Sequence, residues 1–273
     1  MPAIQPALLK KQAVLLVQRL DNPPALVRDL HLLFEFYADR AVRPGQASKN
    51  RPLTVAYKIR PPVLRQIVQE FEPSLESNPQ QGLELCEALW EQNYLEFRLL
   101  AGMLLGRIPV SASEAILKRI ESWVKPDIEA QIIAALFDNG LKRLKQEKPL
   151  AIIQLAKTFL NQNNLFYQQA GLRALKPVLS DANYENLPAF FRLLQPYVLK
   201  INSAIRPDLL EVIAILAKRS PQETAYFLRE SLTLPDNPDT AWIIRHNLDH
   251  FPPRLQTTLR EHVRLYERRM KEK

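Results

Sequence analysis

Residues 57–71 read YKIRPPVLRQIVQEF and residues 85–109 read LCEALWEQNYLEFRLLAGMLLGRIP, and these two segments indicate the fold. After the two prolines at 61 and 62, apolar residues recur at spacings of one, three and four, while polar residues fill the other positions. This spacing predicts an amphipathic α-helix whose first turn is set by proline. Residues 97–105 are apolar over most of a helical circumference, so they predict a helix that neighbouring helices cover.

Prolines recur along the rest of the chain at intervals that suit short helices. A proline in the first turn of a helix loses nothing through its missing N–H, so each of these prolines indicates a helix start. No segment shows sustained two-residue alternation bounded by turn residues, and the sequence therefore predicts an all-α chain. The predicted helices cover residues 5–20, 24–38, 61–72, 79–91, 94–107, 111–124, 126–146, 148–161, 164–179, 184–199, 207–219, 221–233, 238–250 and 252–271.

These helices form antiparallel pairs that recur with a shared layout of helix, short polar turn and helix. The layout predicts a right-handed α-solenoid of HEAT-like helix pairs with a concave basic face. We expect residues 1–273 to form a single helical-repeat domain, with an extended basic loop at 39–54 and a basic C-terminal helix at 254–273. A loop as long as 39–54 is typically functional or mobile.

The composition, with 47% apolar and 24% charged residues, is that of an ordinary globular protein. The single cysteine, Cys86, excludes an intrachain disulfide, and its apolar neighbours predict a buried side chain. A chain without disulfides, signal segment or apolar run of membrane-spanning length is expected to be cytoplasmic, with no membrane partner. No glycine-rich phosphate loop or cysteine pair is present, so we expect neither a cofactor nor a metal.

The net charge of +8 is concentrated in two segments. Residues 40–65 contain seven cations and no acidic residue, and the last twenty residues contain seven cations against three glutamates. Such clusters attract a polyanion, because bound phosphates release their counterions. The alternative is that both segments are solvated surfaces that confer solubility. The cations of the first cluster are Arg40, Arg43, Lys49, Arg51, Lys58, Arg60 and Arg65.

The two opening segments also carry an ordered set of residue types. An aromatic residue precedes Pro-Val-Leu-Arg, Leu-Trp follows, and Glu-aromatic-Arg comes next with a small residue three positions later: Tyr57, residues 62–65, 89–90 and 96–98, and Ala101. This order resembles the HEAT-like DNA alkylation repair glycosylase family (AlkD-like), and the resemblance extends loosely over about residues 55–250. It implies a helical-repeat fold and duplex DNA as a partner.

The resemblance also implies where a catalytic site would lie. In active members, tryptophans at a helix start are followed by a carboxylate near the damaged nucleotide, because glycosidic cleavage builds positive charge on the sugar. Trp123 matches the first aromatic position, and Asp127 is one residue out of register with the carboxylate. Asp127 is alternatively a plain helix N-terminus residue that meets the macrodipole. Gln169 replaces the arginine of the next repeat, and these two departures weaken the case for catalysis.

Three functions remain open from the sequence. The first is DNA binding without established catalysis, with Lys125 and Arg245 joining the seven cations of the first cluster as phosphate contacts. The second is an N-glycosylase that excises 3- or 7-alkylated purines through Trp123 and Asp127. The third is a helical-repeat scaffold for other proteins. The sequence leaves the oligomeric state open.

Overall fold

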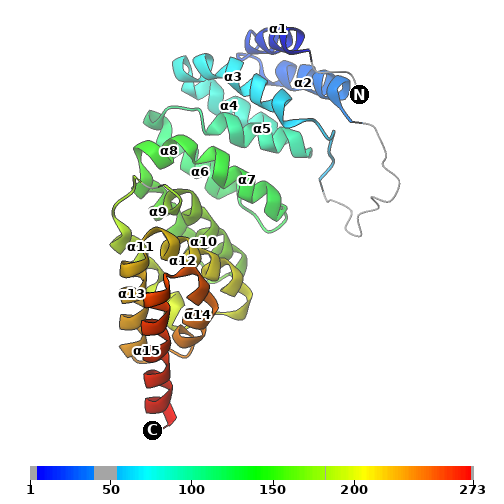
Figure 1. Ribbon diagram of the computed structural model, residues 1–273. Coiled ribbons are helices and arrows are strands. Elements are labelled where there is room, and N and C mark those ends of the chain that lie inside the picture. Colours follow the sequence, from blue (N-terminus) through cyan, green and yellow to red (C-terminus); the bar gives the residue numbers. More distant parts are fainter. Residues whose placement is uncertain (1–4, 40–53, 182, 272–273) are drawn as a thin grey trace, which may run out of the picture. The chain divides into compact units, whose positions relative to one another are not determined.

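The computed structural model describes residues 5–39, 54–181 and 183–271 (Figure 1), and these residues are almost entirely helical. An isolated bridge between Val55 and Tyr94 is the β-type pairing found among them. The α-helices are α1 (Pro6–Val17), α2 (Pro23–Tyr37), α3 (Pro61–Ser77), α4 (Pro79–Trp90), α5 (Leu95–Leu105), α6 (Ser113–Trp123), α7 (Ala130–Gly140), α8 (Lys142–Glu147), α9 (Pro149–Leu160), α10 (Leu165–Leu179), α11 (Leu187–Leu199), α12 (Arg206–Arg219), α13 (Pro221–Thr233), α14 (Thr240–Asn247) and α15 (Pro253–Lys271).

Prolines begin many of these helices, as the sequence predicts. Helices α1, α2, α3, α4, α11, α12 and α13 each have proline in the first two positions. Proline fixes a helical φ at a position where the N–H has no acceptor in the helix. The all-α prediction is therefore confirmed, and its physical basis is visible at each of these helix starts.

The predicted helix at 126–146 is wrong. Residues 126–129 form a turn, α7 begins only at Ala130, and the chain breaks again at Leu141 before the short α8. The buried side chains of Val124 and Ile128 anchor the turn, and the N–H of Ile128 bonds to the carbonyl of Lys125 at 3.0 Å. Burial of these two residues favours a turn at Pro126 over a helix start there.

The chain divides into two compact units, Met1–Lys148 and Pro149–Lys273. In the first unit, α1, α3, α5 and α7 lie in one layer and α2, α4 and α6 in a second (Figure 1). In the second unit, α10, α12 and α14 form one layer, and α11, α13 and α15 the other. Each unit is thus a stack of helix pairs, the arrangement of helical-repeat proteins. The right-handed solenoid, its concave face and the single domain remain predictions.

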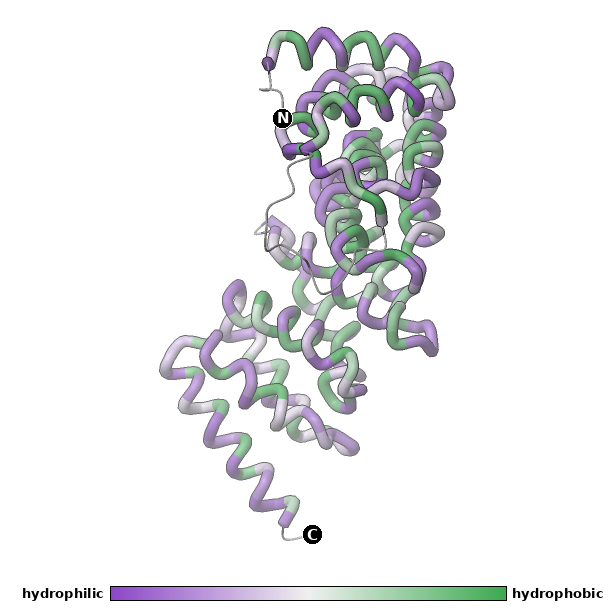
Figure 2. The backbone as a smooth tube through the Cα atoms, turned by 90° about the vertical axis from the view of Figure 1, so that its right-hand side faces the viewer, coloured by the Kyte–Doolittle hydropathy of each residue, from purple (hydrophilic) through white to green (hydrophobic). Residues whose placement is uncertain are grey.

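Apolar and polar residues recur in turn along most of the helices (Figure 2), and the apolar side chains form the buried core. Cys86 is fully buried, as predicted, and burial raises the pKa of its thiol. Within the described ranges, no single helix has the length and apolar character needed to cross a membrane. The bent pair formed by residues 95–105 and 110–123 passes that test by length and composition alone.

Helix α5 approaches α7 so closely that one position has room only for glycine. A Cβ built on Gly106, the residue that follows α5, would lie 1.8 Å from the carbonyl oxygen of Asn139. Four residues earlier, a Cβ on Gly102 would lie 3.5 Å from Leu136, an ordinary contact distance. Gly106 therefore permits the close contact between these two helices.

Candidate nucleic-acid interface

The described part of the basic cluster begins with an extended segment, residues 54–59, which lies against the start of α5. The N–H of Leu95 donates to the carbonyl of Val55 at 2.8 Å, beside the bridge between Val55 and Tyr94. The N–H of Thr54 donates to the Glu129 carboxylate at 2.8 Å, and the Gln131 amide donates to the same carboxylate at 2.7 Å. The segment from Thr54 to Ile59 is therefore fixed on the body of the first unit by residues far away in the sequence.

Glu96 binds the backbone of this segment on both sides of Lys58, the first cation in the described part of the cluster. Its side chain is 3% exposed, and its two oxygens accept the N–H groups of Tyr57 at 3.0 Å and Ile59 at 3.3 Å. Lys58, between these two residues, has a φ of 59°. A carboxylate that accepts two backbone N–H groups forms charge-assisted bonds, which are stronger than neutral ones. Glu96 thus sets the backbone course through Lys58.

Aromatic rings surround the same segment. Tyr57 stacks on Tyr94 with ring centroids 4.9 Å apart, and its hydroxyl lies 2.7 Å from Nδ1 of His31. Phe34 and Phe97 complete the cluster. Burial, followed by the neighbouring Tyr94, raises the pKa of Tyr57 to about 12. The motif residues 57 and 96–97 are therefore brought together as a structural cluster.

The described cations of the basic cluster are exposed. Lys58 and Arg60 come just before α3, with Arg60 as its N-cap residue, and Arg65 lies in the second turn of this helix; all three are exposed. Within the described ranges none of the three forms an ion pair with a carboxylate. Exposed cations without an acidic partner are the groups that can neutralise phosphate.

The other predicted phosphate contacts differ in their surroundings. Lys125 is exposed in the turn after α6 and also has no ion-pair partner among the described residues. Arg245, on α14, pairs with Glu267 of α15, so its charge is already compensated. The remaining four, Arg40, Arg43, Lys49 and Arg51, lie outside the described residues.

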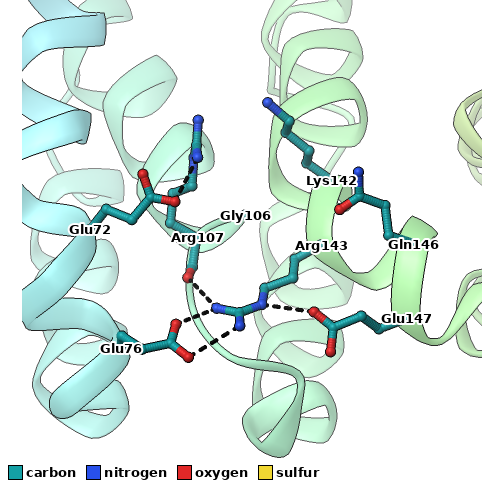
Figure 3. Close-up of a pocket in the computed structure, with 8 residues that line it drawn as sticks. All are labelled: Glu72, Glu76, Gly106, Arg107, Lys142, Arg143, Gln146 and Glu147. Atoms are coloured by element: carbon teal, nitrogen blue, oxygen red, sulfur yellow. Dashed lines mark hydrogen bonds and ion pairs between the residues drawn. The ribbon is translucent and has the colours of Figure 1, made fainter.

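A pocket of about 350 Å³ elsewhere in the first unit shows the opposite arrangement (Figure 3). Arg143 pairs with Glu76 through both terminal nitrogens and with Glu147 at 2.9 Å, and Arg107 pairs with Glu72 at 2.7 Å. These hydrogen bonds raise the pKa of Arg143, and the bond with Arg143 lowers the pKa of Glu76. The guanidinium of Arg143 also donates to the carbonyl of Arg107 at 3.2 Å. The ion pairs in this pocket hold the surrounding helices together, and its arginines are already paired with carboxylates.

The two predicted catalytic residues lie in different environments. Trp123, the last residue of α6, is 3% exposed; it stacks on Trp90 with ring centroids 4.4 Å apart, and its indole N–H donates to Glu87 at 3.1 Å. Asp127 is exposed in the turn. Because α7 begins at Ala130, with Glu129 as its N-cap residue, Asp127 is not at a helix N-terminus either.

The family motif contributes one further residue to this stack. The guanidinium of Arg98 lies 5.7 Å from the ring of Trp90. Its buried Nε has no hydrogen-bond partner in the described structure. In the first unit, Trp90 therefore stacks on Trp123 and has the guanidinium of Arg98 over its ring. In the second unit, Gln169 donates to the carbonyl of Ala204 at 2.9 Å, which is a structural contact.

Two glutamates matter more to this region than the sequence indicated. Glu96 and Glu129 both hold the extended segment, yet neither entered the predicted site. A signal existed for Glu96, because it is the acidic residue in the first turn of a very apolar helix. For Glu129 the predicted helix start at residue 126 is too early, so the sequence does not indicate that this residue is the N-cap of α7.

Stacked helix pairs define the class of this molecule, which is an all-α helical-repeat protein. The model of the family described as DNA alkylation repair enzyme matches residues 37–250, and the chain belongs to this family. No curated protein matches the sequence. The crystal structure of YibA from Escherichia coli is similar at 14% identity and a TM-score of 0.32, covering 75% of this chain and 88% of that one.

Proposed function

We propose that this protein binds the phosphate backbone of duplex DNA, with Lys58, Arg60 and Arg65 as its central contacts in the described structure. One observation carries the proposal: these cations are exposed and have no ion-pair partner within the described ranges, whereas Arg107, Arg143 and Arg245 are paired with carboxylates. Membership of a DNA alkylation repair family supports DNA as the polyanion. Lys125 is a further contact in the first unit, and Arg245 would have to exchange Glu267 for a phosphate.

The held backbone of the segment supports the same proposal. Glu96 and the aromatic cluster fix the course of residues 57–59, so Lys58 and Arg60 are presented from a rigid support. Cations on a fixed backbone lose less conformational entropy on binding than cations on a free loop. Phosphate contacts of this kind position a duplex without reading its sequence.

Removal of the three central cations is expected to weaken DNA binding strongly. Each neutralised phosphate contributes a slope of about −0.9 to the logarithmic salt dependence of affinity. The variant with Lys58→Ala, Arg60→Ala and Arg65→Ala should therefore lose roughly 100-fold in affinity near 0.1 M salt, and its slope should fall by about 2.7. The measurement is fluorescence anisotropy with a labelled duplex over a series of salt concentrations.

A variant with the same net charge is the matched control. Lys10, Lys11 and Lys118 are also exposed and have no ion-pair partner within the described ranges, so their replacement by alanine removes the same total charge. The control variant should keep the slope of the parent. An equal loss in both variants would mean that general electrostatic attraction dominates, and a parent that does not bind at low salt would refute the proposal.

Base excision through Trp123 and Asp127 is not expected. Trp123 is buried against Trp90 with its N–H occupied by Glu87, so it offers no free ring face to a cationic purine. Methylated duplex DNA incubated with the parent protein should release alkylated purines at the spontaneous rate, as measured by chromatography of the free bases. Faster release would establish an enzyme. The Asp127→Asn variant would then decide whether Asp127 is the carboxylate.

A further inference from the structure

Arg98, on α5, is a cation that the first unit partly buries without pairing it with an anion. Its side chain is half-buried, its Nε is buried with no hydrogen-bond partner, and no carboxylate pairs with it in the part of the chain that the structure describes. Burial removes water from a charged group, and this cost is offset only when another group pairs with the charge. Burial of Arg98 therefore has a cost that no anion of the described chain offsets.

The other half-buried arginines among the described residues of this unit all have such a partner. Each lies within ion-pair distance of a glutamate, in three pairs: Arg107 with Glu72 at 2.7 Å, Arg119 with Glu87 at 3.3 Å, and Arg143 with Glu76. The packing of the unit thus supplies a carboxylate to each half-buried guanidinium that the structure describes there, except to that of Arg98.

Glu87 and Glu96, the glutamates that lie inside the same region, already have partners. Glu96 is two residues before Arg98 and faces the other side of α5, because 3.6 residues make one helical turn. Its two oxygens accept backbone N–H groups of the extended segment. Glu87 accepts the indole N–H of Trp123 and pairs with Arg119. A ligand is therefore the best source of an anion for Arg98.

The indole ring of Trp90 supports the guanidinium of Arg98. The guanidinium carbon lies 5.7 Å from the ring centroid, within the range of a cation–π attraction. Trp90 is itself fixed, since it stacks on Trp123 with ring planes 6° apart. A guanidinium held on an aromatic face loses less side-chain freedom on binding, and its planar fork of N–H donors matches the oxygens of a phosphate.

Arg98 lies in the same region as two exposed cations of the proposed interface. It is one turn after Leu95, whose N–H bonds to the extended segment 54–59, which contains the first of these cations. Trp123, which stacks on the ring that supports Arg98, is followed two residues later by Lys125. A DNA backbone bound by the exposed cations of this region would therefore pass close to Arg98.

We propose that Arg98, supported by Trp90, binds one phosphate group of the DNA backbone through two parallel hydrogen bonds. The inference rests on the proposed function, because the DNA supplies the phosphate. This contact differs in kind from those of the exposed cations, which act mainly through their charge and are screened by salt. At Arg98 the shape of the guanidinium also matters, and a lysine cannot form the two-point contact.

Exchange of arginine for lysine tests this difference, because it keeps the net charge. Arg98→Lys should weaken binding to a labelled duplex about 10-fold near 0.1 M salt, since the two-point contact is lost. The control is Arg28→Lys on α2, where the arginine is exposed and has no ion-pair partner in the described ranges, and it should bind within about 2-fold of the parent. Fluorescence anisotropy measures the affinities at a temperature where circular dichroism shows each variant to be folded.

Arg98→Met is the second variant, because its long apolar side chain can still pack on Trp90 but has no charge. It should also bind about 10-fold more weakly, and its salt slope should fall by about 0.9, the value for one phosphate. Parental affinity in both folded Arg98 variants, or an equal loss in Arg28→Lys, would overturn the inference and leave the proposed function intact. Loss of the fold in both Arg98 variants would show a structural arginine and would also overturn it. A parent that does not bind DNA at low salt would refute both proposals.

Discussion

The Gly106→Ala variant is expected to lose about 3 kcal/mol or more of stability in the first unit. The added Cβ would lie 1.8 Å from the carbonyl oxygen of Asn139 and 2.9 Å from its carbonyl carbon. Both are backbone atoms, so no side-chain rotation relieves the overlap, and α5 and α7 must separate. The φ of Gly106 is −74°, which alanine adopts freely, so the expected loss is caused by the overlap and not by the backbone conformation.

Urea denaturation followed by tryptophan fluorescence measures this effect. The chain has three tryptophans, and in a Trp242→Phe background the signal comes from Trp90 and Trp123, both in the first unit. Gly102→Ala is the matched control: it faces the same helix with ordinary contact distances, and alanine in a helix is better than glycine by up to about 1 kcal/mol. Equal midpoints for the two variants would contradict the close approach.

The Glu96→Ala variant is expected to destabilise the protein by about 2–4 kcal/mol. It removes the acceptor of two backbone N–H groups, those of Tyr57 and Ile59, and leaves both donors without their bond. Hydrogen bonds to a charged acceptor are worth more than neutral ones, and an unmade bond at a buried site carries the desolvation penalty. Thermal and urea unfolding measure the loss.

Glu96 variants also test the positioning of Lys58. If Glu96 orients the segment, Glu96→Ala should lower the salt slope of DNA binding by up to about 1, at a temperature where the variant is folded. Glu96→Gln keeps one acceptor oxygen and should fall between the parent and Glu96→Ala. Glu84→Ala is the control, because Glu84 is exposed and accepts only from Gln80 in the described structure. A loss as large at Glu84 would refute the role given to Glu96.

The helices followed from the sequence because their causes are local. Apolar spacing and proline at the first turn are properties of a few adjacent residues. They predict the observed first residues of α3, α4 and α13. The turn at 126–129 could not be placed in this way. It depends on burial of Val124 and Ile128 by other helices, and burial is decided by packing and not by the segment.

The candidate site was only partly visible in the sequence for a similar reason. A run of cations is a local property, and Lys58, Arg60 and Arg65 are exposed as a phosphate contact requires. Whether an arginine forms an ion pair depends on residues that are distant in the sequence. The ion pair between Arg245 and Glu267 was therefore not predictable. The burial of Trp123 depends on Trp90, which lies two helices earlier, and a motif match cannot show which ring faces another.

The conformation of Lys58 has a consequence for how this position is used. With a φ of 59°, the backbone is in the left-handed region, where glycine is unstrained and a lysine costs roughly 1 kcal/mol. The fold alone would be better served by glycine at this point. Residues in strained backbone conformations cluster at functional sites. At position 58, lysine makes the fold less stable than glycine would, but it supplies a positive charge. Under the proposed function, Lys58 is a residue at which folding and DNA binding favour different side chains.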